Sequence, residues 1–368
     1  MEHAGIYLHI PYCVKKCDYC DFFSISDVSG QSLYFETMHR EMEAYRGKNI
    51  SVDSVFIGGG TPSVADAGEI ARLLFWAREI FSFEPDTEIT IELNPKTFDE
   101  EKLKIYREAG VNRISMGLQS ANNDELKKLG RIHTVEEFLH SYELLCKMGF
   151  LNINTDVMYG LPDSSQKTLE RTLSFLKTLD CQHISAYALT LAEDSKMYQR
   201  GYQFPDDDGV YEQYQLVCEM LGNYRHYEIS NFVKMGKSPC RHNLKYWQRV
   251  PYLGFGAAAH SFYEDARWSN PANLEVYVKQ IQMGEPASDW EKISLAEGQS
   301  ERLMLALRLD KGITEADVPE GFFEKNKDFI ERYLEAGYLL KTPLGYRLSE
   351  DGFFVSNALI SSFLERMG

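Results

Sequence analysis

The sequence predicts an α/β fold: a partial, open (β/α)6 TIM-like barrel followed by a smaller, mostly helical, winged-helix-like unit. Between residues 5 and 188, short apolar runs alternate with helical patterns six times, as parallel strands with right-handed crossovers require. Six repeats are too few to close an eight-stranded barrel. From about residue 270 helix-forming segments dominate, so we expect domains at 1–265 and 270–368.

The predicted elements follow from apolar alternation in the strands and helical periodicity between them. Strands are expected at residues 5–10, 52–57, 88–93, 112–118, 151–158 and 183–188. Helices are expected at residues 31–46, 62–81, 99–109, 124–129, 135–148 and 165–179. A helix at 209–221 and a last strand at 227–232 follow, then two helices, a hairpin at 338–348 and a final helix.

Three cysteines directly after the first strand, Cys13, Cys17 and Cys20, point to a metal site. Three thiols within eight residues always leave one over in a disulfide set, whereas thiolates are the usual ligands of iron–sulfur clusters. A four-iron cluster held by three cysteines keeps one iron open to a small molecule. The alternative is a three-cysteine zinc site, which usually needs a fourth Cys or His at a matching spacing.

Polar and glycine residues gather at the expected strand ends, where barrels of this kind place their chemistry. The second strand runs into a glycine triplet, residues 58–60, and Thr61, which would let the backbone approach a ligand closely; a tight turn explains the triplet equally well. Four polar residues lie at or just beyond successive later strands. They are Glu92, Gln119, Arg131 and Asp156.

A second segment, residues 240–247, combines His242 with Tyr246 and Trp247. A histidine beside aromatic faces could place an axial ligand next to a porphyrin. The residues by themselves favour a polar turn whose Tyr246 and Trp247 pack inward.

Composition limits the classes of partner. The net charge of −16 repels nucleic acid and anionic membranes, and residues 291–368 hold 10 basic against 14 acidic side chains, so we expect no nucleic-acid partner. No run approaches the roughly 18 apolar residues of a membrane span, and no signal sequence precedes the cysteines. The four remaining cysteines are scattered, which favours a reducing cytoplasm.

The cysteine run, Cys-x3-Cys-x2-Cys with Tyr19 before its third cysteine, resembles the radical S-adenosylmethionine (SAM) family. The preceding residues, Gly5 to Tyr12, are similar to the coproporphyrinogen dehydrogenase-like branch. The resemblance implies a [4Fe–4S] cluster on Cys13, Cys17 and Cys20, with SAM on the open iron. An electron from the cluster would split SAM into a 5′-deoxyadenosyl radical, chemistry that belongs to the cofactor, so no side chain is assigned as catalytic.

The same resemblance implies a set of SAM contacts. They are Tyr7, Tyr19, Gly59, Gly60, Thr61, Glu92, Gln119, Arg131 and Asp156. In that family the glycine motif binds the amino group of SAM, and Arg131 would meet the methionyl carboxylate. Tyr7 would lie close to the sulfonium.

Two departures separate the chain from the dehydrogenases of the branch. Phe22 stands where they carry a fourth cysteine, and Cys13 lies close to the first residue, so we expect no counterpart of their N-terminal extension. The chain is instead similar to the haem chaperones of the branch. That similarity implies haem contacts, with His242 as the candidate iron ligand. They are His242, Asn243, Tyr246 and Trp247.

The expected function is therefore that of a haem chaperone, which binds haem, a [4Fe–4S] cluster and SAM and passes haem to respiratory membrane proteins. Such a protein would be cytoplasmic, would contact the membrane peripherally during delivery, and would need an electron donor if SAM is cleaved. The alternative is an oxygen-independent coproporphyrinogen III oxidase, which converts propionates to vinyl groups by radical decarboxylation. A weaker alternative is a radical enzyme that modifies RNA or protein.

Overall fold

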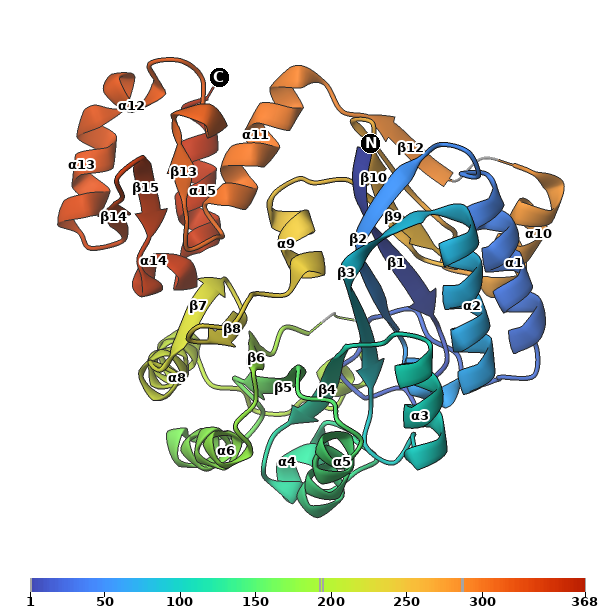
Figure 1. The fold of residues 1–368 in the computed structure, drawn as a ribbon. Coiled ribbons are helices and arrows are strands. Elements are labelled where there is room, and N and C mark those ends of the chain that lie inside the picture. Colours follow the sequence, from blue (N-terminus) through green and yellow to red (C-terminus); the bar gives the residue numbers. More distant parts are fainter. Residues whose placement is uncertain (1, 192, 194, 286–287, 368) are drawn as a thin grey trace.

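The computed structural model describes residues 2–191, 193, 195–285 and 288–367. Its first half contains six parallel strands: β1 (Glu2–Ile10), β2 (Ile50–Gly59), β3 (Ser82–Leu93), β4 (Arg113–Gln119), β5 (Ile153–Tyr159) and β6 (His183–Ala188). Between them lie α1 (Gln31–Glu43), the short η1 (Pro62–Val64), α2 (Ala67–Ile80), α3 (Glu100–Glu108), α4 (Asn123–Lys128), α5 (Val135–Lys147) and α6 (Gln166–Leu179). The predicted six strand–helix repeats and the open barrel are confirmed (Figure 1).

Three strands begin earlier than predicted, among them β2, which begins at Ile50. β1 starts at Glu2 and β3 at Ser82, because each pairs with β2 over its early residues, Glu2 with Ile50 and Ser82 with Ser51. These early residues are strand because they pair with β2, and the sequence of a single strand does not reveal its pairing partner.

The prediction of one strand over residues 227–232 is wrong. The chain forms a hairpin of β7 (Tyr224–Glu228) and β8 (Asn231–Lys234), which follows α7 (Lys196–Gln199) and α8 (Asp207–Met220). The Glu228 carboxylate accepts hydrogen bonds from the Ser230 amide and the Asn231 side chain, so it stabilises the reversal. β8 pairs antiparallel with β6 and ends the parallel part of the sheet.

The two faces of the barrel strands differ in polarity. Ile6, Leu8 and Ile10 of β1 are fully buried in the apolar core that also contains side chains of α1 and α2. The alternating inner positions on later strands are buried but polar, among them Thr90 and Arg113. A polar interior of this kind suits a ligand site more than a packed apolar core.

On its other side the sheet continues past β1. This extension contains β9 (Tyr252–Phe255), β10 (His260–Tyr263), β11 (Ala266–Ser269) and β12 (Ser288–Lys292), with α9 (Arg241–Trp247) before it and α10 (Leu274–Met283) within it. The sheet therefore runs beyond residue 265 to Lys292, and the division at 265–270 stays a prediction.

The C-terminal residues form a small antiparallel sheet in the order β13-β15-β14 with helices around it (Figure 1). The elements are α11 (Leu295–Ala306), β13 (Ile313–Thr314), η2 (Glu315–Asp317), α12 (Phe322–Lys325), α13 (Lys327–Glu335), β14 (Leu339–Lys341), β15 (Gly345–Leu348), α14 (Glu350–Phe354) and α15 (Ser356–Leu364). The predicted order of helix, helix, hairpin and helix is confirmed, but the final helix is divided into α14 and α15. Among the described helices, none has the length and apolarity to cross a bilayer.

Candidate functional site

A cavity of about 160 Å³ lies at the carboxyl ends of β1 to β5 and collects nearly all predicted cluster and SAM residues. Those that line it are Cys13, Cys17, Tyr19, Cys20, Gly59, Gly60, Thr61, Glu92, Gln119, Arg131 and Asp156. They come from positions spread over more than 140 residues of sequence, and parallel strands bring them to one edge. Only Tyr7 of that predicted set is absent from the lining.

The loop that carries the three cysteines is fixed by backbone hydrogen bonds. The Cys13 amide donates to the Ile25 carbonyl (2.9 Å), the Asp18 amide to the Leu129 carbonyl (3.1 Å), and the Cys20 amide to the Cys17 carbonyl (3.2 Å). The last of these closes a tight turn that holds Cys17 and Cys20 near each other. Burial, and less strongly the neighbouring thiols, raise the pKa of Cys20 to about 11.

Arg131 places a fixed positive charge at this cavity. Its guanidinium donates to Asn94 Oδ1 (2.5 Å), the Gly117 carbonyl (3.1 Å) and Cys17 Sγ (3.6 Å). Burial opposes its charge, but the Tyr19 hydroxyl and the Cys17 thiol outweigh burial and raise the Arg131 pKa. Its Nε is buried and has no partner among the described residues. An N–H group without a partner on a buried cation can bind the carboxylate of a ligand.

Asn94 is a site residue that the sequence analysis missed. Its Oδ1 accepts from Arg131, and its amide donates to Thr61 Oγ1 (2.7 Å), so it joins two of the predicted residues. The available signal was its position directly after Leu93, the last residue of β3. Ser115, on the inner face of β4, also lines the cavity without having been predicted.

The glycine triplet is explained by close approach. A Cβ on Gly60 would lie 2.8 Å from the Tyr12 carbonyl oxygen and 3.1 Å from Cys13 Sγ. Gly59 has φ +115°, which favours glycine, and its amide donates to Glu92 Oε2 (3.2 Å). The backbone of this turn therefore lies against the cysteine loop, with no room for a side chain.

Two carboxyl groups share the polar interior next to the triplet. Burial, followed by repulsion from Asp156, raises the pKa of Glu92 to about 8, although the Gly59 amide lowers it in part. Burial also raises the pKa of Asp156, against hydrogen bonds from Ser185 and Asn154. Glu92 is therefore mostly protonated at neutral pH and can donate as well as accept a hydrogen bond.

Tyr7 lies between the cavity and α9. Its hydroxyl is 3.2 Å from His9 Nδ1, and its ring centroid is 6.4 Å from that of His242. Burial and the Glu92 carboxyl raise its pKa, so the phenol stays neutral. Tyr7 thus connects the predicted SAM site with the predicted haem segment.

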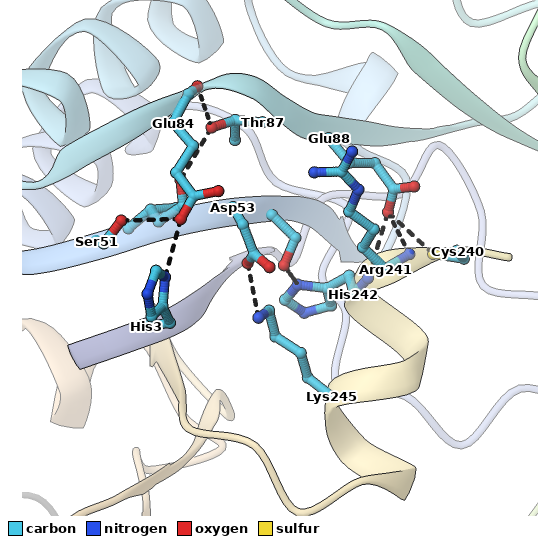
Figure 2. Close-up of polar contacts among 12 residues, drawn as sticks. His3, Ser51, Asp53, Glu84, Thr87, Glu88, Cys240, Arg241, His242 and Lys245 are labelled. Atoms are coloured by element: carbon cyan, nitrogen blue, oxygen red, sulfur yellow. Dashed lines mark hydrogen bonds and ion pairs between the residues drawn. The ribbon is translucent and has the colours of Figure 1, made fainter. Parts of the chain in front are cut away.

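The segment from residue 240 is a helix, α9, and not a turn, and it fills the amino end of the barrel (Figures 1 and 2). The Glu88 carboxylate of β3 accepts hydrogen bonds from the Arg241 amide (2.9 Å) and the His242 amide (3.3 Å) at the start of this helix. Lys245 Nζ lies 2.6 Å from Asp53 Oδ1 of β2. These contacts hold α9 against β2 and β3.

His242 is enclosed in this packing, with 1% of its surface exposed. Its Nδ1 lies 3.2 Å from Ser54 Oγ and its Nε2 lies 2.9 Å from the Tyr246 hydroxyl. The Phe56 ring stacks on it at 5.4 Å between centroids. Burial and the Lys245 charge lower its pKa to about 3, so the ring is neutral. Both nitrogens are hydrogen-bonded, so iron ligation by His242 requires one of these two hydrogen bonds to break.

The other two predicted haem residues are not brought together with His242. His242 and Tyr246 lie one helical turn apart on one part of the surface of α9. Asn243 and Trp247 are also one turn apart, but each follows its counterpart by one residue and therefore lies on a different part of that surface. The Trp247 ring lies 5.9 Å from the Arg308 guanidinium, just after α11, so it faces the C-terminal unit.

The cavity residues fit a cluster with SAM, because three thiols, a buried guanidinium donor without a partner and the half-buried backbone of Gly59 and Gly60 line the same cavity. The α9 residues, in the packing observed, do not form an open haem pocket. The role of each residue stays a prediction.

Comparison with known proteins gives the following matches. Residues 7–176 match the Radical SAM superfamily. The chain is similar to "Heme chaperone HemW" of Bacillus subtilis, with 32% identity over 97% of this chain and 98% of the relative. It is also similar to "Heme chaperone HemW" of Haemophilus influenzae, with 33% identity over 98% of this chain and 97% of the relative. In structure it resembles coproporphyrinogen III oxidase (HemN) of Escherichia coli, with a TM-score of 0.84 and 21% identity over 100% of this chain and 90% of that one. The last likeness shows the fold alone.

Proposed function

Because this chain belongs to the HemW family of the Radical SAM superfamily, we propose that it binds haem and acts as a haem chaperone. The observation that carries the proposal is similarity to proteins of that name over nearly the whole chain, from the cysteine loop through α9 to the C-terminal unit. A shared radical SAM segment alone would support only the superfamily.

The proposal includes a [4Fe–4S] cluster held by Cys13, Cys17 and Cys20, with SAM beside it. When bound, the cluster would supply the electron for reductive cleavage of SAM, if SAM is cleaved. The residues of the chain bind the cluster and SAM and orient them. Arg131 donates a hydrogen bond from its unpartnered Nε to the SAM carboxylate, and the backbone of Gly59 and Gly60 accepts hydrogen bonds from the SAM amino group. Tyr7, Tyr19, Thr61, Glu92, Gln119 and Asp156 complete the proposed SAM contacts.

For haem, we propose that α9 is the binding segment and that His242 becomes an iron ligand once one of its ring nitrogens loses its hydrogen bond. The proposal rests on membership of the HemW family and on the residues of α9. The closed packing around His242 adds a condition for haem binding. Haem binding must be coupled to the loss of the hydrogen bond at one ring nitrogen of His242, either to Ser54 or to Tyr246. Delivery to membrane-bound respiratory proteins, by a cytoplasmic chain with peripheral membrane contact, belongs to the same proposal.

The test is a haem titration of anaerobically reconstituted protein with two variants that act in opposite directions. His242→Ala removes the proposed ligand and should weaken haem binding at least tenfold. Tyr246→Phe removes only the hydroxyl that engages Nε2, so it should leave haem affinity unchanged or raise it. Equal haem affinity in His242→Ala and the unmodified protein would remove this histidine from the proposal.

The same preparation distinguishes the enzymatic alternative. Incubation with SAM, a reductant and coproporphyrinogen III should yield no protoporphyrinogen, because Phe22 stands where the dehydrogenases have a fourth cysteine. Formation of protoporphyrinogen would show a coproporphyrinogen III oxidase instead.

A further inference from the structure

A cluster of three potential metal ligands lies far from the cysteine loop, where the barrel meets the C-terminal unit. It consists of Cys218 on α8, His226 on β7 and Glu350 at the start of α14, and these elements lie side by side in Figure 1. One ligand atom from each residue lies within 4.8 Å of the other two. Residues up to 132 positions apart in sequence thus offer sulfur, nitrogen and oxygen to one point.

The histidine is oriented as a metal ligand would be. His226 Nε2 lies 3.1 Å from the Ile229 carbonyl, which can only accept, so Nε2 carries the proton and Nδ1 has a free lone pair. Nδ1 is shielded from solvent and has no hydrogen-bond partner among the described residues. Metal-binding histidines commonly donate their second ring nitrogen to a carbonyl in this way.

The surroundings hold the ring in place and keep it neutral. The Phe232 ring stacks on His226 at 4.0 Å between centroids, and Phe353 contacts it edge-on at 5.1 Å. Burial lowers the pKa of His226 to about 4. Burial raises the pKa of Cys218 to about 12, and the Glu350 and Asp351 carboxylates add to the rise, although the hydrogen bond with Tyr214 lowers the pKa in part. In the absence of a cation, the thiol therefore keeps its proton beside an unpaired imidazole nitrogen.

We propose that Cys218, His226 and Glu350 bind one zinc ion, with water in the fourth position. Mixed sulfur, nitrogen and oxygen donors in a tetrahedral set are typical of zinc. Binding replaces the Cys218 proton, which leaves to solvent, so the new thiolate and the Glu350 carboxylate together balance the two positive charges of the ion.

Such an ion would join the barrel to the C-terminal unit. The same junction already contains a hydrogen bond from the Tyr214 hydroxyl to the Glu350 carbonyl (2.9 Å) and one from Tyr211 to Asp351 (2.8 Å). Zinc would fix α14 against α8 at this point, and with it the C-terminal unit that faces Trp247 of α9.

The test uses the full chain with Cys13, Cys17 and Cys20 all replaced by Ser, so that the cluster loop cannot take zinc. Zinc affinity is measured by competition with a chromophoric chelator, and Co²⁺ serves as a spectroscopic probe of thiolate ligation. We expect one zinc ion per chain and a thiolate-to-cobalt charge-transfer band. Cys218→Ser should abolish the band.

Glu350→Gln is the variant that keeps the fold, because Glu350 is exposed. It should weaken zinc binding about tenfold or more, while Cys146→Ser, which changes an exposed cysteine elsewhere, should leave it unchanged. Zinc affinity that is equal in Glu350→Gln, Cys218→Ser and the background chain, or no zinc retained at all, would overturn the proposal.

Discussion

Gly60→Ala tests whether the close contact between the glycine turn and the cysteine loop positions the site. The added Cβ would lie 2.8 Å from the Tyr12 carbonyl oxygen and 2.9 Å from the Pro11 carbonyl carbon, both backbone atoms. Ordinary contacts begin near 3.4 Å, so the cysteine loop must move by roughly half an ångström. Functional constellations tolerate about 0.5 Å before they lose activity. Overpacking of this kind costs about 1–3 kcal/mol.

At about 1.4 kcal/mol per factor of ten, we expect SAM to bind about 5- to 150-fold more weakly to Gly60→Ala. The assay is isothermal titration of anaerobically reconstituted protein with SAM, together with iron content and a thermal melt. Gly30→Ala is the matched control, because its Cβ would meet nothing within 4 Å. Iron content and SAM affinity within twofold of the unmodified protein would refute the reasoning that this contact positions the site.

Three further predictions address the cluster, α9 and a buried carboxyl. Cys17→Ala should abolish the visible absorbance of the reconstituted cluster, and retained absorbance would show that the ligands lie elsewhere. Glu88→Ala should cost about 1–3 kcal/mol in urea unfolding, because it leaves the first amides of α9 without their acceptor; Glu84→Ala, on the same strand, is the comparison. Burial raises the pKa of Glu41 to about 7, so the folded state holds a proton that the unfolded state releases near 4.5. Stability should therefore be fully present below about pH 4.5 and fall by about 3 kcal/mol as pH rises through 7, relative to Glu41→Gln; parallel pH profiles of the two proteins would contradict this.

Much of the fold was predictable because its signals are local. Alternation in the strands and helical periodicity between them gave the six repeats, and α5 begins where predicted, after the capping side chain of Thr134. The helix predicted over residues 62–81 is wrong at its start, because the chain forms the short η1 first and α2 begins after the Asp66 cap. The hairpin of β7 and β8 was missed, because its turn depends on the Glu228 side chain and no glycine or proline marks it.

The candidate site was also predictable from the sequence only in part. Parallel strands place their carboxyl ends at one edge, so Glu92, Gln119 and Asp156 could be grouped from their positions alone. Asn94 could not be assigned a role, because its importance depends on hydrogen bonds to Thr61 and Arg131 that only the folded chain forms. The residue pattern of this segment also does not show that both ring nitrogens of His242 are hydrogen-bonded.

By itself, the sequence determined the cysteine spacing, the strand–helix alternation and the family to which the chain belongs, because these depend on residues close together along the backbone or on the pattern of the whole chain. Only the tertiary structure decided that α9 fills the amino end of the barrel and that Cys218, His226 and Glu350 meet. Side chains that approach through long-range packing carry no common period or spacing, so the physical cause of their meeting is the packing of the elements that carry them.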